Sequence, residues 1–423
     1  MNKRWPAALA AAGLAWYASD SLRHRREGGR GYELEASLDV GGESFLRATE
    51  AITGAPVSYG NDVELLVNGD NIFPAFLETI SSATKTLNLL TYVYWTGDIA
   101  HDVADAVSKR ALEGVTCNVL LDAVGAMKMD SGLISSMEDA GVRVRRFRPV
   151  KPYAIRRVTN RTHRKILVAD GATGMTGGVG IAQEWTGNAH DPEHWRDTHI
   201  RVRGPVVRGL QGAFAENWLE ATGEVLAGED YLPQLKPVDG GGAMQVMRSS
   251  AGVGDTDAEA LYYLAIASAR KSLFLTSAYF APRPAFIEAL VEASRHGVDV
   301  RILVPGPYTD KGIVRQAGRS SYNRLLSEGV RIFEYQPTML HAKCLVVDGV
   351  WSSIGSVNFD NRSFQLNDEA TLCVQSRHFA QQLTEVFEKD LAQSEEFQLE
   401  RWKKRPPRQR ALEQVGRIIR REL

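Results

Sequence analysis

The sequence predicts an α/β fold built from two related halves. Helical stretches alternate with short apolar strands along most of the 423 residues, a pattern typical of α/β units on a parallel or mixed sheet. The chain is also longer than one hydrophobic core usually supports. Comparing the chain with itself shows matched segments in the same order in each half, so duplication of one α/β unit is the simplest architecture.

The matched segments set the expected order of elements. Each half contains a helix end with a buried strand and aromatics, then a helix, a glycine turn and a β-branched strand, then a short strand and a longer motif segment. The pairs are 84–95 with 270–281, 111–125 with 293–306, 139–147 with 327–335, and 162–181 with 340–359. We therefore expect a first repeat over 60–220, a Gly- and Pro-rich linker over 221–245, and a second repeat over 246–395.

Composition and charge narrow the class of protein. Hydrophobic residues make up 44% of the chain and charged residues 24%, which argues against disorder, a collagen-like repeat or a polytopic membrane protein. The formal net charge of −1 is unevenly distributed: residues 1–30 hold six Lys or Arg and two acids, and residues 397–423 hold nine and three. The body between them is therefore acidic. The three cysteines lie far apart in apolar runs, so we expect buried thiols without disulfides or metal-ligand spacing.

The N-terminal 1–30 segment is a candidate membrane anchor. Residues 5–18 are uncharged and are flanked on both sides by Lys or Arg. A stretch of 14 residues is too short for a confident transmembrane helix, and no clean A-x-A cleavage site follows it. An interfacial anchor on anionic lipid fits this pattern better, and a frayed amphipathic terminus is the alternative.

The C-terminal 397–423 segment is basic, is interrupted by Pro406-Pro407 and ends in an amphipathic pattern with Leu412, Val415, Ile418 and Ile419 on one side. Such a helix can pack on the body with its arginines in water, or it can form a patch drawn to acidic lipids. Because both ends of the chain combine apolar and basic residues, we favour the membrane-surface interpretation.

One motif occurs twice with the same residue types and spacing, H-x-K-x4-D. Alternate residues of a strand face the same side, so the histidine and lysine of each copy project together. Seven residues after each aspartate comes a glycine turn, GGVG at 177–180 and GSVN at 355–358, which allows close backbone approach and oxyanion donors. A single H-x-K is usually a surface histidine beside a solvated lysine, but two copies 178 residues apart argue against coincidence. The candidate catalytic set is the six motif residues His163, Lys165, Asp170, His341, Lys343 and Asp348.

This duplicated motif resembles the phospholipase D superfamily, and within it the sequence around the motif most resembles bacterial cardiolipin synthases. The resemblance is carried by residues 340–370 (LHAKCLVVDGVWSSIGSVNFDNRSFQLNDEA), 163–171 (HRKILVADG) and 194–207 (HWRDTHIRVRGPVV), and it extends from about 60 to about 390. It implies a duplicated α/β/α sandwich of two pseudo-twofold related halves, with one active site at their interface. It also implies phosphatidyl transfer without a metal ion or other cofactor.

The residue types suit that chemistry. One neutral histidine can attack phosphorus to form a phosphohistidine, while the other, protonated, gives a proton to the departing alcohol. Lys165 and Lys343 can neutralise the non-bridging oxygens. The resemblance implies that His163 is the nucleophile and His341 the general acid and base, although the symmetry of the sequence leaves their order open.

Several further residues are expected to support the pair of histidines. By the same resemblance, Asp197, 34 residues after His163, and Glu369, 28 residues after His341, are orienting carboxylates, each on a stretch expected to run beside a motif strand. Asp170 and Asp348 precede glycines, so we expect them to brace turns rather than carry protons. The first copy has Gly180 where the second has Asn358, so we expect an asymmetric site. The supporting set is Asp197, Glu369, Gly178, Ser356 and Asn358.

The resemblance implies phosphatidylglycerol as donor and the hydroxyl of a second phospholipid as acceptor, at an anionic bacterial inner membrane. With water as acceptor the same intermediate gives phosphatidic acid, so a hydrolytic phospholipase D is the first alternative. A nuclease is the second: the arginine-rich stretch 143–161 favours it, and the acidic body disfavours nucleic acid as a partner. A scaffold with a dead site is disfavoured by the two intact motifs. Trp95 and Phe280 are expected near the site entrance.

Overall fold

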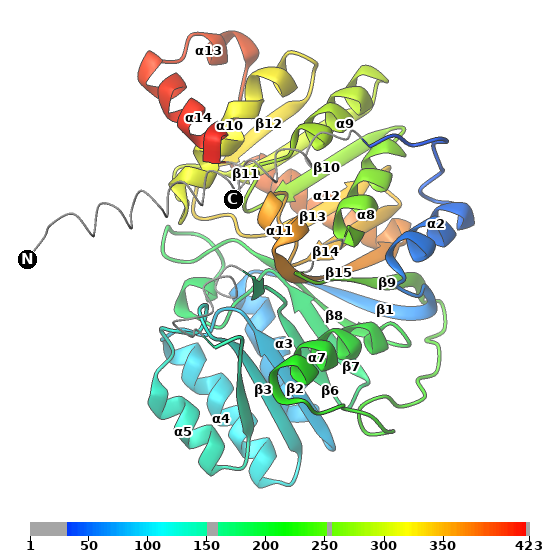
Figure 1. Cartoon of the computed structure of the whole chain (residues 1–423), viewed down its shortest axis with the longest axis vertical. Helices are drawn as coiled ribbons and strands as arrows, with labels where there is room; N and C mark the ends of the chain where they lie inside the picture. The colour runs from blue at the N-terminus through cyan, green and yellow to red at the C-terminus, as the bar shows by residue number, and fades with distance from the viewer. Residues whose placement is uncertain (1–31, 150–159, 252–255, 420–423) are drawn as a thin grey trace, which may run out of the picture. The chain divides into compact units, whose positions relative to one another are not determined.

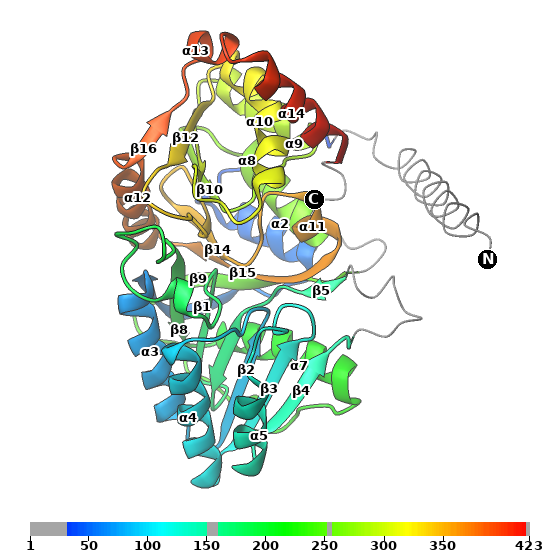
Figure 2. The same ribbon diagram turned by 90° about the vertical axis from the view of Figure 1, so that its left-hand side faces the viewer.

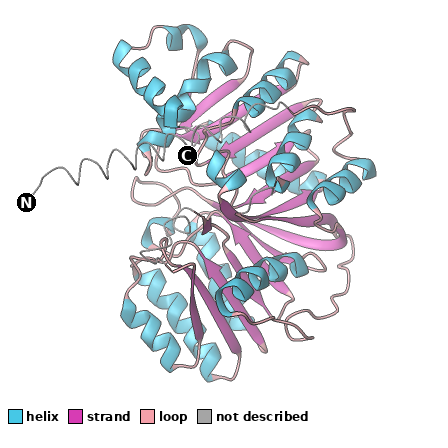
Figure 3. Ribbon diagram, in the orientation of Figure 1, coloured by secondary structure: helices cyan, strands magenta, loops and turns pink. Residues whose placement is uncertain are grey.

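The computed structural model describes residues 32–149, 160–251 and 256–419. The predicted α/β class is confirmed: sixteen strands of the described residues form a mixed sheet with helices on both faces (Figures 1 and 3). The expected N-terminal anchor, residues 1–30, lies outside the described residues. Within residues 37–419, which belong to one compact unit, the sheet runs continuously from one half to the other.

The first half contributes one side of the sheet. Strands β2, β3 and β4 are parallel, and β6, β7, β8 and β1 continue from β2 in antiparallel order. Their bounds are β1 Ser58–Val67, β2 Thr86–Thr91, β3 Thr116–Asp122, β4 Arg143–Phe147, β6 Ile166–Ala169, β7 Thr173–Gly177 and β8 Thr198–Arg203. Strand β2 is buried along its whole length, as expected for a parallel strand covered on both faces.

The second half repeats this order. Strands β10, β11 and β12 are parallel, and β13, β14, β15 and β9 continue in antiparallel order from β10. The two sides join where β1 pairs with β9, so the strand order is symmetrical about that pair. The bounds are β9 Gly242–Ser249, β10 Ser272–Ser277, β11 Asp299–Pro305, β12 Arg331–Tyr335, β13 Lys343–Val347, β14 Trp351–Gly355, β15 Asn367–Gln375 and the edge strand β16 Ser394–Glu396. The repeat and linker boundaries given above remain predictions.

Helices complete an α/β/α arrangement. In the first half α3 (Gly69–Ser82), α4 (Asp98–Leu112) and α5 (Ser131–Asp139) enclose one core against the sheet. A second core lies under α7 (Val207–Thr222) and α12 (Arg377–Leu391) and contains strand residues from both halves. The remaining helices are α2 Glu43–Thr53, α8 Asp257–Ala267, α9 Pro284–Arg295, α10 Gly312–Leu326, α11 Asn361–Gln365, α13 Leu399–Lys403, α14 Pro407–Ile419 and the 3-10 turn η1 Gln183–Trp185. Apolar burial shared by the halves stabilises them as one unit.

The described part of the C-terminal segment packs on the body. Trp402 of α13 lies 5.2 Å from the ring of Tyr322 on α10, and α14 crosses α10 closely where Gly416 meets Ala317 (Figure 2). Of the two arrangements considered for this segment, packing on the body and a patch drawn to acidic lipids, the described part shows the packing. The side chains of Val415, Ile418 and Ile419 lie outside the described set. Among the described residues, no helix combines the length and apolarity that a membrane crossing requires.

The two motif aspartates brace turns, as predicted. Asp170 and Asp348 adopt left-handed φ angles of 53° and 54° between paired strands. The carboxylate of Asp170 accepts the backbone N–H groups of Thr84, Lys85 and Thr86 at 2.7–3.1 Å. Asp348 accepts those of Arg270, Lys271 and Ser272 in the same way. Each aspartate therefore ties its turn to the segment before β2 or β10.

Loss of this brace should destabilise the fold. We expect Asp170→Ala to lower the free energy of unfolding by about 2 kcal/mol or more, because several N–H groups lose a charged acceptor. Urea denaturation followed by circular dichroism measures it. The matched control is Asp230→Ala, which removes only the exposed ion pair with Lys85 and should cost about 0.5 kcal/mol or less. Equal stability of the two variants would contradict the bracing role.

Candidate active site

The first histidine is held by the second half of the chain. The segment β5 (Arg161–Thr162) pairs with β15, and the backbone N–H of His163 donates to the carbonyl of Asp368 at 2.8 Å. The next residue of β15 is Glu369, whose two carboxylate oxygens lie 3.0 and 3.1 Å from His163 Nδ1. A carboxylate only accepts, so Nδ1 carries the hydrogen and Nε2 is left with a free lone pair.

The second histidine is held by the first half in the same manner. The N–H of His341 donates to the carbonyl of Arg196 at 2.7 Å, and His341 Nδ1 lies 2.8 Å from Asp197 Oδ2. The sequence order suggested that each carboxylate would lie beside the motif strand of its own half. Instead the partners are exchanged between the halves, because each histidine follows a segment that pairs across the interface.

Both motif lysines are buried beside the histidines. Lys165 Nζ donates to the carbonyl of His163 at 2.7 Å, and Lys343 Nζ lies 3.1 Å from His341 Nε2. Burial and mutual repulsion lower the pKa of Lys165 to about 7, and burial lowers the pKa of Lys343 to about 8. Burial, reinforced by the lysines, lowers the pKa of His163 to about 3 and of His341 to about 4, against the opposing effect of their carboxylates. Both imidazoles are thus neutral near pH 7.

Asp197 is fixed by three donors. Besides His341, the indole N–H of Trp185 donates to Oδ2 at 2.9 Å and the backbone N–H of Thr198 donates to Oδ1 at 2.7 Å. Although burial opposes ionisation, His341 and Lys343 hold the pKa of Asp197 well below its usual range. A side chain at Gly178 would collide with this carboxylate, so this glycine of the first turn is required for close approach.

Glu369 is held differently. It accepts the hydroxyl of Ser356 and, at 3.4 Å, the side-chain amide of Asn367. The second glycine turn is expected to supply oxyanion donors, but the hydroxyl of its Ser356 donates to Glu369 instead. The N–H of Asn358 donates to the Ser363 hydroxyl at 3.0 Å, and its side-chain carbonyl oxygen is buried without a partner among the described residues. A side chain at Gly180 would clash with Val93, so the expected asymmetry has a steric basis.

The structure does not bring every candidate residue together. Asp170 and Asp348 lie at the far ends of the short motif strands from the histidines, in the turns described above. Phe280, expected near the entrance, is buried and stacked on Phe359 with ring centroids 5.8 Å apart. That expectation is wrong, because the chain after β10 turns this ring into the core. Trp95 remains half-buried.

Sequence reasoning missed three supporting residues. Trp185 packs in the core of the first half, and its indole N–H also donates to Asp197, with its ring 5.2 Å from that of His341. Arg164, inside the first motif, is fully buried and donates to the carbonyls of Glu369 and Ser249 at 3.1 and 2.9 Å. Arg196 forms a bidentate pair with Asp390. The position of an arginine inside or beside a candidate catalytic motif can be read from the sequence. Its burial and its hydrogen-bond partners depend on tertiary structure.

Much of the basic stretch 143–161 is neutralised by partners. Arg143 pairs with Glu224, Arg148 with Glu220 at 2.6 Å, and Arg161 with Asp122 at 3.0 Å. Residues 150–159 are outside the described ranges. Among the residues that the structure describes, no cluster of three or more His, Cys, Asp or Glu side chains is suited to binding a metal ion.

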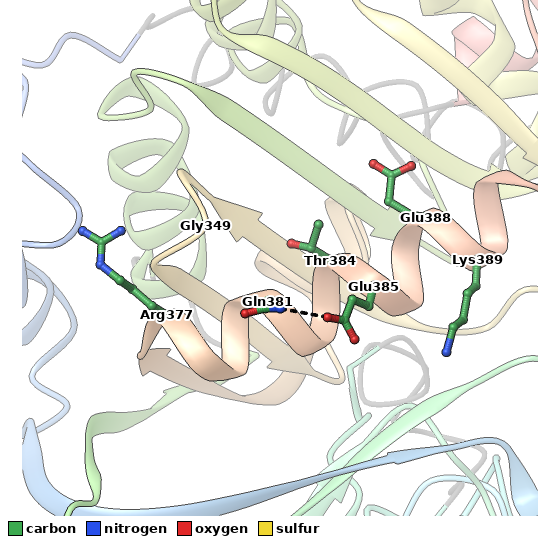
Figure 4. Close-up of a pocket in the computed structure, with 7 residues that line it drawn as sticks. All are labelled: Gly349, Arg377, Gln381, Thr384, Glu385, Glu388 and Lys389. Carbon is green, nitrogen blue, oxygen red and sulfur yellow. Dashed lines mark hydrogen bonds between the residues drawn. The ribbon is translucent and has the colours of Figure 1, made fainter.

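A hollow on the outer face of α12 is separate from the histidines. It is lined by Gly349, Arg377, Gln381, Thr384, Glu385, Glu388 and Lys389 (Figure 4). Gly349 follows the turn at the end of β13 opposite His341, so this hollow lies away from the histidine pair.

Known proteins resemble the chain over most of its length. The family described as cardiolipin synthase, PLD-like domain, matches residues 76–194 and 262–391, once in each half. A cardiolipin synthase of Geobacillus sp. (strain WCH70) is 36% identical over 380 residues, covering 89% of this chain and 75% of that protein. One from Alkalihalophilus pseudofirmus is 34% identical over 397 residues, covering 93% and 79%.

Solved structures agree on the fold. The phosphatidylserine synthase of Haemophilus influenzae superposes with a TM-score of 0.69 over 90% of this chain and 100% of that one, at 14% sequence identity. With the duplicated family domain and the symmetrical sheet, this confirms the predicted phospholipase D-like fold. The chain therefore belongs to the phospholipase D-like cardiolipin synthase family and is an enzyme of the phospholipase D superfamily.

Proposed function

We propose that the protein is a phosphatidyltransferase that makes cardiolipin from two molecules of phosphatidylglycerol through a phosphohistidine. The observation that carries this proposal is the exchanged pair of histidine–carboxylate couples with two buried lysines between them. Relatives of about 35% identity are named cardiolipin synthases, which supports phospholipids as the substrates. An anionic bacterial inner membrane is the proposed location.

In the first step, neutral His163 attacks phosphorus through Nε2, because its Nδ1 is engaged with Glu369. The P–N bond forms as the bond from phosphorus to the glycerol oxygen breaks. Protonated His341 gives its proton to that oxygen, and glycerol leaves. Lys165 and Lys343 stabilise the charge on the non-bridging oxygens, so the proposed reaction needs no metal ion.

In the second step, His341 takes the proton of the acceptor hydroxyl, and the acceptor oxygen displaces His163 from phosphorus. Cardiolipin forms and both histidines return to their starting states. Burial lowers the pKa of His341, so in this proposal His341 takes up a proton from solvent when the substrate anion binds. A diester anion placed between the two lysines would offset their repulsion of a third positive charge, and Asp197 would stabilise the imidazolium.

Hydrolysis to phosphatidic acid is the alternative with the same intermediate. A nuclease is less favoured, because Arg143, Arg148 and Arg161 of the basic stretch are ion-paired rather than free for a phosphate backbone.

Product analysis separates these functions. Purified full-length protein in mixed micelles with phosphatidylglycerol and excess chelator should yield cardiolipin and glycerol in equal amounts, measured by mass spectrometry. Phosphatidic acid as the sole product would show a hydrolase. DNA cleavage without any lipid product would refute both lipid functions, and loss of turnover with chelator would refute metal independence.

Trapping of the phosphoenzyme tests the assignment of the histidines. With phosphatidylglycerol labelled in its phosphatidyl group, His341→Asn should retain a slow, acid-labile label on His163, whereas His163→Asn should retain none. The exchanged partners predict that Glu369→Gln suppresses label formation by about 10²–10⁴-fold, since it removes the group that orients His163. Asp197→Asn should instead slow the steps that need the His341 proton. Label in His163→Asn but not in His341→Asn would reverse the order.

Anion binding should depend on pH through the lysines. Their lowered pKa values, about 7 and about 8, mean that protons leave the empty site as the pH rises from about 6 to about 9 and must return when an anion binds. Sulfate, used as a non-titrating probe, should therefore bind about tenfold or more weakly at the upper pH. Calorimetry in two buffers of different protonation enthalpy counts the protons taken up. Lys165→Arg, which stays charged, should reduce the slope and exposed Lys85→Arg should not; a flat wild-type profile contradicts this account.

A further inference from the structure

Two exposed loops carry apolar side chains where the repeat places them in matched positions. Residues 123–130 follow β3, and residues 306–311 follow its repeat counterpart β11. Met127 in the first loop is 70% exposed. Tyr308 in the second loop is 44% exposed, and Ile313, just after that loop, is 49% exposed. Exposed large apolar side chains that recur at matched loops of both halves indicate a surface patch and not scattered single residues.

The first loop is fixed to the active site through aromatic rings. The indole N–H of Trp95 donates to the carbonyl of Gly125 at 2.8 Å, and Lys128 Nζ lies 4.0 Å from the Trp95 ring centroid. Trp95 contacts Trp185 with centroids 5.9 Å apart, and Trp185 contacts His341 at 5.2 Å. The loop that carries the exposed Met127 is thus linked through Trp95 and Trp185 to a proposed catalytic histidine.

The second loop reaches the same histidine from the other half. The hydroxyl of Tyr279 donates to Asp310 at 2.7 Å, and Lys311 Nζ lies 4.4 Å from the Tyr279 ring centroid. Tyr279 in turn lies 6.2 Å from the ring of His341. Both loops therefore present an exposed lysine and exposed apolar side chains beside one active site.

We propose that Met127, Lys128, Tyr308, Lys311 and Ile313 form a docking rim that contacts the surface of an anionic bilayer. This inference rests on the proposed function and names how the enzyme meets its substrate. The histidines are buried, so a diester that stays in its bilayer can reach them only if the bilayer meets the site entrance. Apolar tips can enter the headgroup boundary while lysines pair with lipid phosphates.

Fluorescence quenching in the full-length protein measures whether the rim residues contact the bilayer. Met127→Cys and Ile313→Cys are each labelled with a bimane fluorophore and mixed with phosphatidylglycerol–phosphatidylethanolamine vesicles carrying a quencher on the acyl chains. We expect strong quenching at both positions. The matched control is Leu112→Cys, which is 74% exposed and lies near the opposite end of β3 from Met127. The native chain gives the labelling background, since Cys117 and Cys373 are buried and Cys344 is partly buried.

The outcomes distinguish this inference from the proposed function. Vesicle binding with unquenched rim probes, or with equal quenching at Leu112, overturns the rim, because another part of the chain then faces the bilayer. Failure of the chain to sediment with these vesicles also overturns it. Rim quenching without any cardiolipin product would instead keep the rim and refute the transferase reaction.

Activity gives a second measurement. We expect the triple variant Met127→Ser, Tyr308→Ser, Ile313→Ser to turn over phosphatidylglycerol in vesicles on the order of tenfold more slowly, since it loses apolar contact with the bilayer. Its turnover of short-chain phosphatidylglycerol dispersed in detergent should match that of wild type, as should Leu112→Ser on both substrates. An equal loss on both substrates would show a general defect and overturn the rim.

Discussion

The proposed active site depends on one constraint, which is that each histidine is hydrogen-bonded to a carboxylate from the other half of the chain. His163 is held by the backbone of Asp368 and the side chain of Glu369, and His341 by the backbone of Arg196 and the side chain of Asp197. Neither half contains a complete histidine–carboxylate couple. Duplication of the fold is therefore required by the site itself, and the continuous sheet with its shared core keeps the halves in register.

Burial of so many ionisable groups is tolerable because their charges balance. Two buried lysines accompany two buried carboxylates, and without its partners any one of these charges would be costly to bury. Burial still lowers the pKa values of Lys165 and Lys343 to about 7 and about 8, although the carboxylates oppose this shift. An arriving phosphodiester adds one negative charge and so favours full protonation of the lysines and of one histidine. Substrate binding and protonation are thus coupled by electrostatics in the proposed mechanism.

The sequence predicted the parts of this arrangement that depend on local order. The i, i+2 spacing correctly placed each histidine beside its lysine, although both histidines and Lys165 lie just before β6 and β13 and not within a strand as expected. The Asp-Gly pairs correctly indicated braced turns at Asp170 and Asp348. The exchange of carboxylates could not be predicted, because distance along the chain favours Asp197 with His163, whereas pairing of β5 with β15 is a tertiary contact. For the same reason the sequence does not show that Phe280 points into the core, because side-chain direction after a strand is set by packing, not by residue type.

The two couples differ in a way that bears on which histidine attacks. Asp197 receives the Trp185 indole N–H and a main-chain N–H besides His341, so it stays anionic and favours a positive imidazole beside it. Besides His163, Glu369 receives a hydroxyl and a longer amide contact, both from side chains. A nucleophile must be neutral, and a general acid must hold a proton when the alcohol leaves. The asymmetry therefore supports His163 as the nucleophile and His341 as the acid, a division that the symmetrical motifs alone leave open.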